Sequence, residues 1–342
     1  MTTSCCNPNP AVDVHGGTSA PEIRPSTGRL TSADRWNHVL ARWGYRRGDH
    51  RIMPGLCALG RPTASSPVFV TANYTLSFDA LRAALDGLNG YILVLDTLGV
   101  NVWCAAGKGA FGTDELVRQI EATSLHQVVD HRRLILPQLG APGVAAHEVK
   151  RRTGFAVEYG PVRAADLPAY LEMGRATPEM RRVRFDLRDR LVLIPVELVH
   201  VLWPALAAGL ILYLALGPVA ALATVAAILA GAALFPLLLP WLPTRDFSSK
   251  GFVLGGLTAL PFVLAALAGP GDWPLRIALG LALALALPPV TAYLALNFTG
   301  ATTFTSKSGV KREMARYIPV MTGLFGSGVV AALVTVALRW LR

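Results

Sequence analysis

The distribution of hydrophobic residues changes abruptly along the chain. Before about residue 190, short apolar runs are separated by amphipathic and polar segments, whereas the remainder contains much longer apolar runs. A helix of ~20 apolar residues is long enough to cross a bilayer. The pattern therefore predicts a soluble N-terminal part followed by a membrane part.

The N-terminal part has the pattern of strands that alternate with helices. Amphipathic helices are predicted at 77–88, with Ser77 as the N-cap, and at 113–122, which Thr113 opens. Short buried strands are predicted at 67–73, 91–97, 101–105, 133–139 and 154–160. The alternation implies a Rossmann-like α/β domain with a mainly parallel sheet covered on both faces. Ligands of such sheets bind at the carboxyl ends of the strands.

The C-terminal part is predicted to be an all-α transmembrane domain of five helices. The expected spans are about 194–216, 219–241, 252–269, 275–296 and 318–338. The loops after the second and fourth spans are rich in Lys and Arg, so the positive-inside rule places them and the N-terminal domain in the cytoplasm of a multi-pass inner-membrane protein. Arg339 and Arg342, at the outer end, count mildly against this orientation. Spans two to five contain almost no ionisable residue, which favours anchoring or partner docking over transport.

Composition and charge refine this division. Residues 1–30 are rich in Pro, Gly, Ser and Thr and are predicted to be a disordered tail, followed by a domain at 31–190 and the membrane domain at 191–342. The formal net charge is +10, and an arginine cluster at 181–190 precedes the first span, where flanking positive charges belong. The basic balance therefore requires no nucleic-acid partner.

The four cysteines are Cys5, Cys6, Cys57 and Cys104. Their spacing fits neither a C-x-x-C pair nor an iron–sulfur or zinc site, so no iron–sulfur cluster is expected in this chain. The N-terminus lacks the pattern of a signal peptide. A thiol in the N-terminal domain is therefore expected to stay reduced.

Cys104 lies in the segment NVWCAAGK, at the end of the strand predicted at 101–105. It could be a small buried residue, a nucleophile paired with His126 or His131, or a metal or cofactor ligand. Small residues follow it, which would let a bulky planar partner approach, and Lys108 would favour the thiolate. The segment lacks the residues of a phosphate-binding P-loop. The residues alone leave these roles open.

NVWCAAGK resembles the signature of HgcA, the corrinoid protein family of mercury methylation. Further resemblance to this family, and to the large subunit of the corrinoid iron–sulfur protein of acetyl-CoA synthesis, extends over 67–82, 91–116, 134–144 and 154–171. The iron–sulfur carrier has an N-terminal four-cysteine motif and is soluble. The absence of that motif and the five predicted spans favour the HgcA branch.

The resemblance implies an anaerobe's methyltransferase with a cobalt corrinoid cofactor, which transfers a methyl group from Co(III)-methylcorrinoid to Hg(II) to form methylmercury. Cys104 would be the lower axial cobalt ligand, as the thiolate. Asn101 would fix the loop, and Lys108 would tune the thiolate or contact a corrin side chain. Ala105, Ala106 and Gly107 would give the corrin clearance. Weaker candidates for lining the site, at predicted strand ends, are Thr71, Asn73, Thr97, Gln138 and Tyr159.

The resemblance also implies partners. The methyl group would come from methyltetrahydrofolate through a separate methyltransferase, and electrons from a ferredoxin-like protein with two [4Fe-4S] clusters of the HgcB type. Cys5 and Cys6 could pass Hg(II) to the site as neighbouring thiols. Residues 297–314 resemble a segment of the iron–sulfur carrier, and this last predicted loop either contacts a partner or the corrinoid domain or is simply a polar loop with basic anchors.

Two other functions remain open on the sequence. The first is a membrane-anchored corrinoid methyl carrier in acetyl-CoA-type one-carbon metabolism. The second is a cobalamin-loaded membrane module that binds or transports without catalysis.

Overall fold

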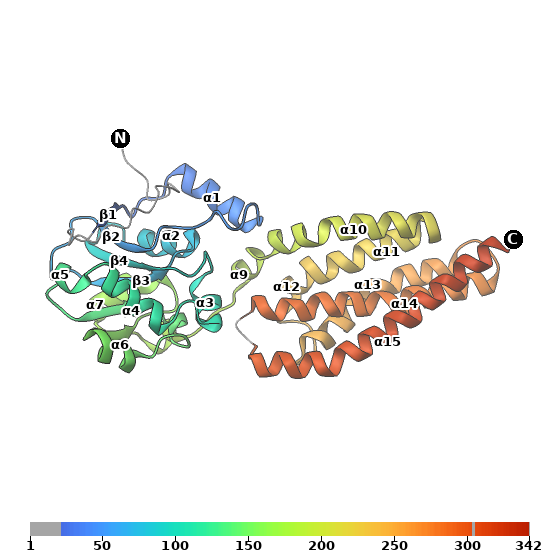
Figure 1. Cartoon of the computed structure of the whole chain (residues 1–342). Coiled ribbons are helices and arrows are strands. Elements are labelled where there is room, and N and C mark those ends of the chain that lie inside the picture. The colour runs from blue at the N-terminus through green and yellow to red at the C-terminus, as the bar shows by residue number, and fades with distance from the viewer. Residues whose placement is uncertain (1–21, 303–304, 342) are drawn as a thin grey trace. The chain divides into compact units, whose positions relative to one another are not determined.

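The structure is a computed structural model that describes residues 22–302 and 305–341 (Figure 1). Its chain divides into two compact units, one up to Val183 and one from Arg184 onward. The first unit is an α/β domain, and the second is helical throughout the described part of the chain. Cys5 and Cys6, the cysteine pair suggested to pass Hg(II), lie outside the described residues.

The first unit is built on one six-stranded sheet. Its strands are β1 (Ile23–Ser26), β2 (Gly55–Leu59), β3 (Val68–Ala72), β4 (Gly90–Leu95), β5 (Arg133–Leu136) and β6 (Ala156–Tyr159). Their order across the sheet is β1-β2-β4-β3-β5-β6. Only the β2–β4 pair is antiparallel among these strands, which confirms the predicted mainly parallel α/β fold.

Helices cover both faces of this sheet. They are α1 (Ser32–Arg42), α2 (Thr75–Ala84), α3 (Val102–Lys108), α4 (Thr113–Ala122), α5 (Leu125–Val128), α6 (Ala146–Thr153), α7 (Leu167–Met173) and α8 (Pro178–Arg181), with 3₁₀ turns η1 (Gln138–Gly140) and η2 (Ala164–Asp166). Successive side chains of a strand point to opposite faces, so Val70 packs with α3, α4 and α6 while its neighbour Phe69 packs with α2 and α7. Both central strands, β3 and β4, are buried along their whole length.

The prediction of a strand at 101–105 is wrong, because this segment forms the start of helix α3. Val and Trp favour a strand, but Asn101 is a good N-cap residue and the alanines after Cys104 favour a helix. Sheet pairing gives no competing partner, since β4 already ends at Leu95. The motif therefore starts a helix after a loop.

Part of the predicted disordered tail is also ordered. Ile23–Ser26 forms the edge strand β1, parallel to β2. The Arg24 guanidinium donates hydrogen bonds to the carbonyls of Met53 and Pro54, at 2.6 and 2.9 Å, which anchor the strand. Pro25 is tolerated because an edge strand leaves one row of amides unpaired. Amino-acid composition alone cannot reveal these tertiary contacts.

One predicted helix start is shifted, and the other lacks the predicted cap. Helix α2 begins at Thr75, with Tyr74 as its N-cap rather than Ser77. Helix α4 begins at the predicted Thr113, but the hydroxyl of Thr113 accepts a hydrogen bond from the Ala145 amide (2.9 Å) instead of capping the helix. Tertiary contacts thus override the local capping preference.

The second unit contains five helical segments long and apolar enough to cross a membrane, as predicted. Its elements are α9 (Leu187–Leu191), α10 (Ile194–Leu216), α11 (Pro218–Leu229), the π-helical turn η3 (Ala230–Leu234), α12 (Phe235–Leu238), α13 (Phe247–Ala268), α14 (Trp273–Asn297), the 3₁₀ turn η4 (Phe298–Ala301) and α15 (Lys307–Trp340). Small residues bring α13 and α14 together, because a Cβ at Gly251 would lie 2.6 Å from Ala292 Cα. The last helix starts at residue 307, so much of the predicted loop 297–317 is helical.

Candidate functional site

The loop after β4 is held by one buried asparagine. Asn73 follows β3, and its Oδ1 accepts hydrogen bonds from the amides of Thr97 (3.0 Å) and Gly99 (2.9 Å). The Asn73 amide group also donates to the Asp96 carboxylate at 3.0 Å. Asn73 and Thr97 are 3% and 0% exposed, so the bond between them lies in the interior, whereas the bonds to Gly99 and Asp96 are partly buried. The end of β3 thereby fixes the chain that leads into α3.

Helix α3 is capped at both ends by the residues that the motif supplies. The Asn101 Oδ1 accepts a hydrogen bond from the Cys104 amide at 2.9 Å, which is the loop-fixing contact expected of Asn101. Gly109, at φ 90°, ends the helix in the left-handed conformation that glycine adopts without strain. A helix of seven residues has few internal hydrogen bonds, so these caps contribute much of its stability.

The helix presents two different faces. Val102, Ala105 and Ala106 are buried against the sheet. Cys104 is partly exposed, and Gly107 and Lys108, three and four residues later, are exposed. Residues at this spacing lie on the same side of a helix. The outward face of α3 is therefore a thiol followed by a glycine and a lysine.

Gly107 leaves open space beside Cys104. A Cβ placed on Gly107 would have no heavy atom within 4 Å, outside its own helix and chain neighbours. Glycine inside a helix costs about 0.5–1 kcal/mol relative to alanine. Packing within the described part of the chain thus gives no reason for a glycine here, whereas a bulky group lying over Cys104 would.

Ala105 and Ala106 do not give the clearance that was predicted for them. Both are turned into the core, at 0% and 5% exposure. The loop at Gly143 instead packs closely on α3 at Ala106. A Cβ on Gly143 would lie only 3.0 Å from the Ala106 Cα, so this contact needs small residues on both sides. The helical conformation explains the difference, since a strand would have placed alternate residues outward.

The predicted strand-end residues brace the site more than they line it. Thr71 is buried, like Asn73 and Thr97. Tyr159 is half-buried, and its hydroxyl donates to the Val144 carbonyl at 2.5 Å. Gln138 begins η1, which contacts α3, and its side chain accepts a hydrogen bond from Arg181 at 3.0 Å. Their contacts shape the loops around α3.

Leu98 is a site residue that the sequence did not reveal. It lies in the β4–α3 loop with φ at 58°, a left-handed conformation that is costly for a bulky residue. Its side chain is 63% exposed. A strained, exposed leucine three residues before Asn101 offers an apolar contact to a ligand. In the sequence, the only indication of this strained turn is that Leu98 precedes Gly99.

In the part of the chain that the structure describes, neither His126 nor His131 is paired with Cys104. His131 lies before β5, at the amino edge of the sheet, where its Nε2 is 2.9 Å from the Ser66 carbonyl oxygen. His126 contacts Gln127 and the Arg132 side chain. In residues 22–302 and 305–341, no group of three His, Cys, Asp or Glu side chains is placed to hold a metal ion. A metal bound by Cys104 would have to bring other ligands with it.

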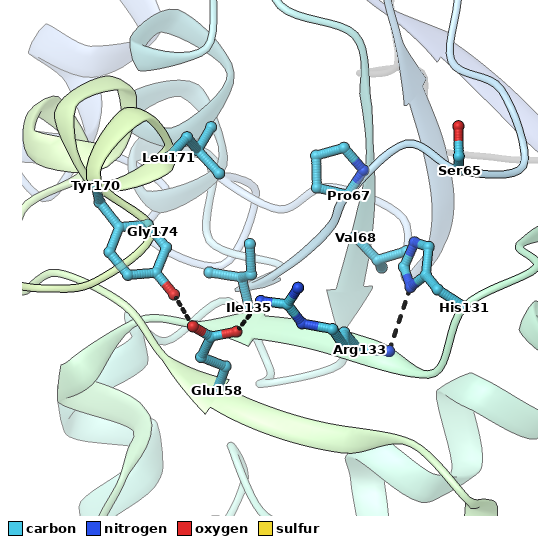
Figure 2. Close-up of a pocket in the computed structure, with 10 residues that line it drawn as sticks. All are labelled: Ser65, Pro67, Val68, His131, Arg133, Ile135, Glu158, Tyr170, Leu171 and Gly174. Atoms are coloured by element: carbon cyan, nitrogen blue, oxygen red, sulfur yellow. Dashed lines mark hydrogen bonds and ion pairs between the residues drawn. The ribbon is translucent and has the colours of Figure 1, made fainter.

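Apart from the α3 face, a pocket of about 350 Å³ lies at β5 and β6 (Figure 2). Glu158 lines it and accepts hydrogen bonds on its two carboxylate oxygens, one from Arg133 and one from the Tyr170 hydroxyl, both at 2.7 Å. Burial alone would raise the pKa of Glu158, but these hydrogen bonds and the Arg133 charge outweigh burial and lower it. These polar groups satisfy one another, which is typical of a structural ion pair.

The comparisons with known proteins concern the first unit. Residues 47–171 match the family described as CO dehydrogenase/acetyl-CoA synthase delta subunit. The acetyl-CoA decarbonylase/synthase complex subunit gamma of Archaeoglobus fulgidus is 32% identical over 124 residues, or 36% of this chain and 26% of the relative. The corresponding subunit of Methanopyrus kandleri is 32% identical over 128 residues, or 37% and 27%. The corrinoid/iron-sulfur protein large subunit of Moorella thermoacetica is 27% identical over 129 residues, or 37% and 28%.

The matched region contains β2 to β6 and the whole of α3. The chain spans about a quarter of the length of these relatives. The similarity therefore does not assign the activities of the whole relatives to this chain. The similarity confirms the predicted relation to the corrinoid iron–sulfur carrier. Residues 47–171 are thus related to the CO dehydrogenase/acetyl-CoA synthase delta subunit family.

Proposed function

We propose that this chain is a membrane-bound, corrinoid-dependent methyltransferase whose methyl acceptor is Hg(II) and whose product is methylmercury. Cys104 would hold the corrinoid cobalt through its thiolate. The observation that carries the proposal is the outward face of α3, where the Cys104 thiol is followed by Gly107 and open space. The relatives support a corrinoid, because one of them is named as a corrinoid/iron-sulfur protein large subunit.

The residues present fit a large planar cofactor. Cys104 is the sulfur donor at the carboxyl edge of the sheet, the usual ligand edge of such folds. Gly107 would leave room for the ring, and Leu98 and Lys108 would contact its edge or side chains. Asn101 and Asn73 would hold the thiol in place from behind.

A bound corrinoid would supply a cobalt that accepts a methyl group and passes it on. The contribution of Cys104 would be its charge, since a thiolate donates more electron density to a metal than a neutral ligand does. Hg(II), a soft metal ion, is a suitable methyl acceptor. Asn73 and Thr97 are buried where the chain leaves β3 and β4 toward α3.

The same proposal includes the partners and the orientation. Methyltetrahydrofolate would be the ultimate methyl source, and a ferredoxin-like protein of the HgcB type, with two [4Fe-4S] clusters, would return the cobalt to its reduced state. The relatives are named as subunits of complexes, which supports a requirement for partner proteins. The five apolar helices would anchor the chain, with the first unit in the cytoplasm.

A second function is favoured by the comparisons. The archaeal relatives are named as acetyl-CoA decarbonylase/synthase complex subunits, so this chain would instead be a membrane-anchored methyl carrier of one-carbon metabolism. Such a carrier would use the same α3 face. It would exchange its methyl group with a methyltransferase of carbon metabolism in the absence of mercury.

The test is anaerobic methylmercury production from Hg(II) with the partner ferredoxin co-expressed. We expect product from the wild type and none from Cys104→Ala. Cys57→Ala is the matched control, because it removes the other described thiol from the buried strand β2 and leaves α3 intact. Corrinoid loading is followed in parallel by visible absorption.

The possible results separate the two functions. Corrinoid loading without methylmercury from the wild type would favour the methyl carrier. Equal activity of wild type and Cys104→Ala would overturn the assigned role of Cys104. Loss of activity in Cys57→Ala alone would mean that fold stability, rather than ligation, limits the reaction.

A further inference from the structure

The second unit contains a pocket of about 260 Å³ that the function above does not use. It is lined by Phe185, Arg190, Leu239, Pro240, Arg245, Phe247 and Lys250. These residues lie at the start of the first apolar span, just after the end of the second and at the start of the third. If each span crosses the bilayer, those three ends lie on the same side. The pocket is therefore placed at a membrane–water interface.

Arg190 is the buried cation of this pocket. It is 5% exposed, and its Nη1 donates to the carbonyl of Leu237 in α12. Its guanidinium carbon lies 5.5 Å from the centre of the Trp241 ring. Its Nε is buried without a hydrogen-bond partner in the described structure. A buried donor of a charged group left unpaired is costly, so a missing acceptor is indicated here.

Two further cations line the pocket. The Lys250 Nζ donates to the carbonyls of Leu239 (2.8 Å) and Leu242 (2.9 Å), which holds the ammonium group at the wall. Arg245 is exposed and makes no ion pair within the described part of the chain. Three positive charges thus face a small volume.

The nearby carboxylates do not neutralise this charge from within the pocket. None of the seven described lining residues is acidic. Asp246, beside Arg245, accepts a hydrogen bond from the Tyr317 hydroxyl at 2.9 Å. Asp186 and Asp189 form the capping box of α9. The pocket therefore keeps a net positive lining and favours an anion.

The other wall of the pocket is apolar. Phe185 and Phe247 line it together with Leu239. Behind them, Phe235 packs against Phe247 and Phe298, with ring centres 5.8 and 6.1 Å apart. A site lined by both cations and aromatic rings, at the ends of three spans, matches the chemistry of a phospholipid at its headgroup.

We propose that this pocket binds the phosphate of an anionic phospholipid headgroup. The phosphate oxygens would accept hydrogen bonds from Arg190 Nε and Arg245, near the Lys250 charge. The glycerol and the first acyl carbons would lie on Phe185 and Phe247. Free phosphate shares the charge chemistry but has nothing to place on the aromatic wall.

The test uses the full chain purified in a mild detergent. Its thermal unfolding midpoint and its bound lipid, by native mass spectrometry, are measured during titration with phosphatidylglycerol, phosphatidylcholine or inorganic phosphate. Arg245→Gln is the main variant, because Arg245 is exposed and supports no described contact of the fold. Arg312→Gln is the matched control, since Arg312 is an exposed arginine outside the pocket. Arg190→Gln tests the buried cation.

We expect phosphatidylglycerol to raise the unfolding midpoint and phosphatidylcholine to leave it unchanged. Arg245→Gln should weaken apparent phosphatidylglycerol binding about tenfold, the worth of one charge-assisted hydrogen bond, while Arg312→Gln should bind like the wild type. Equal binding of phosphatidylglycerol by wild type and Arg245→Gln would overturn the proposal. Stabilisation by inorganic phosphate with no gain from the lipid would overturn the lipid assignment.

Discussion

The Asn73 side chain joins the ends of two neighbouring strands, because its Oδ1 lies 2.9 Å from the Thr97 hydroxyl and also accepts the Thr97 amide. The chain after β4 therefore leaves the sheet along one fixed path toward Asn101. The Thr97 hydroxyl lies 2.6 Å from the Val100 carbonyl as well, so its single proton is shared between two acceptors. Asn73 controls the placement of the thiol from a distance.

Asn73→Ala should loosen this loop. The buried amide of Thr97 and the partly buried amide of Gly99 would lose their acceptor, which costs about 2–4 kcal/mol in total. We expect faster hydrogen exchange at residues 96–101 and weaker corrinoid loading. Asn89→Ala is the matched control, because the Asn89 side chain accepts one backbone amide, that of Arg61 (2.8 Å), before β4 rather than after it. Unchanged exchange at 96–101 in Asn73→Ala would disprove the bracing role.

Asn101→Ala should destabilise α3 by about 1 kcal/mol, the usual cost of losing an N-cap side chain. Asn101→Asp keeps an acceptor for the Cys104 amide and should retain loading and methylmercury formation. Thr177→Ala removes a similar cap, where the Thr177 side chain accepts the Met180 amide (3.3 Å) at α8, and should leave loading intact. If Asn101→Ala and Asn101→Asp load the corrinoid equally well, the cap has no part in holding the thiol.

Much of the fold follows from local sequence patterns. The apolar runs at β3 and β4, buried on both faces, and the long apolar helices were predictable because burial on all sides requires continuous hydrophobic residues. Strand β2 was not predicted. Its sequence GLCAL has no β-branched residue and no alternation of apolar and polar residues. Its antiparallel pairing with β4 depends on tertiary contacts rather than on local sequence.

Candidate residues for the site could be named from the sequence, but the geometry of the segment could not. Cys104 and Lys108 were proposed from residue type and Asn101 from the family resemblance, and all three lie with Gly107 on the exposed side of α3. Treating the segment as a strand placed Ala105 and Ala106 at the ligand, although the helix turns both into the core. A seven-residue helix is too short for its periodicity to be recognised against a preceding strand.

The pH dependence of the first unit should reflect Glu158. Because the pKa of this carboxyl is lowered in the folded state, its ionised form favours folding above the unfolded pKa, and this contribution disappears as the pH falls through the folded pKa. Glu158→Gln should therefore reduce the loss of stability between about pH 5 and pH 3. Hydrogen exchange of β5 and β6 in the full chain measures this loss. Glu172→Gln, at an exposed position of α7, should keep the wild-type dependence; identical acid slopes for both variants would contradict the role of Glu158.

Gly107 offers the sharpest test of the open face of α3. Gly107→Ala should preserve or increase stability, by up to about 1 kcal/mol, because alanine is the better helix residue and its Cβ meets no heavy atom within 4 Å. Gly107→Leu should fold as well but fill the space beside Cys104. We therefore expect corrinoid loading to fall from wild type to alanine to leucine while the unfolding midpoint stays level or rises.

The control for this series is Gly48→Leu. Gly48 is also exposed in the first unit, and a Cβ there would likewise have no heavy atom within 4 Å. Loading by Gly48→Leu should equal that of the wild type, which would show that the loss at Gly107 is local. Normal loading by Gly107→Leu would mean that no bulky group lies over this turn of the helix. Cys104 would then need another binding geometry, because its neighbour on the exposed face would not border the cofactor.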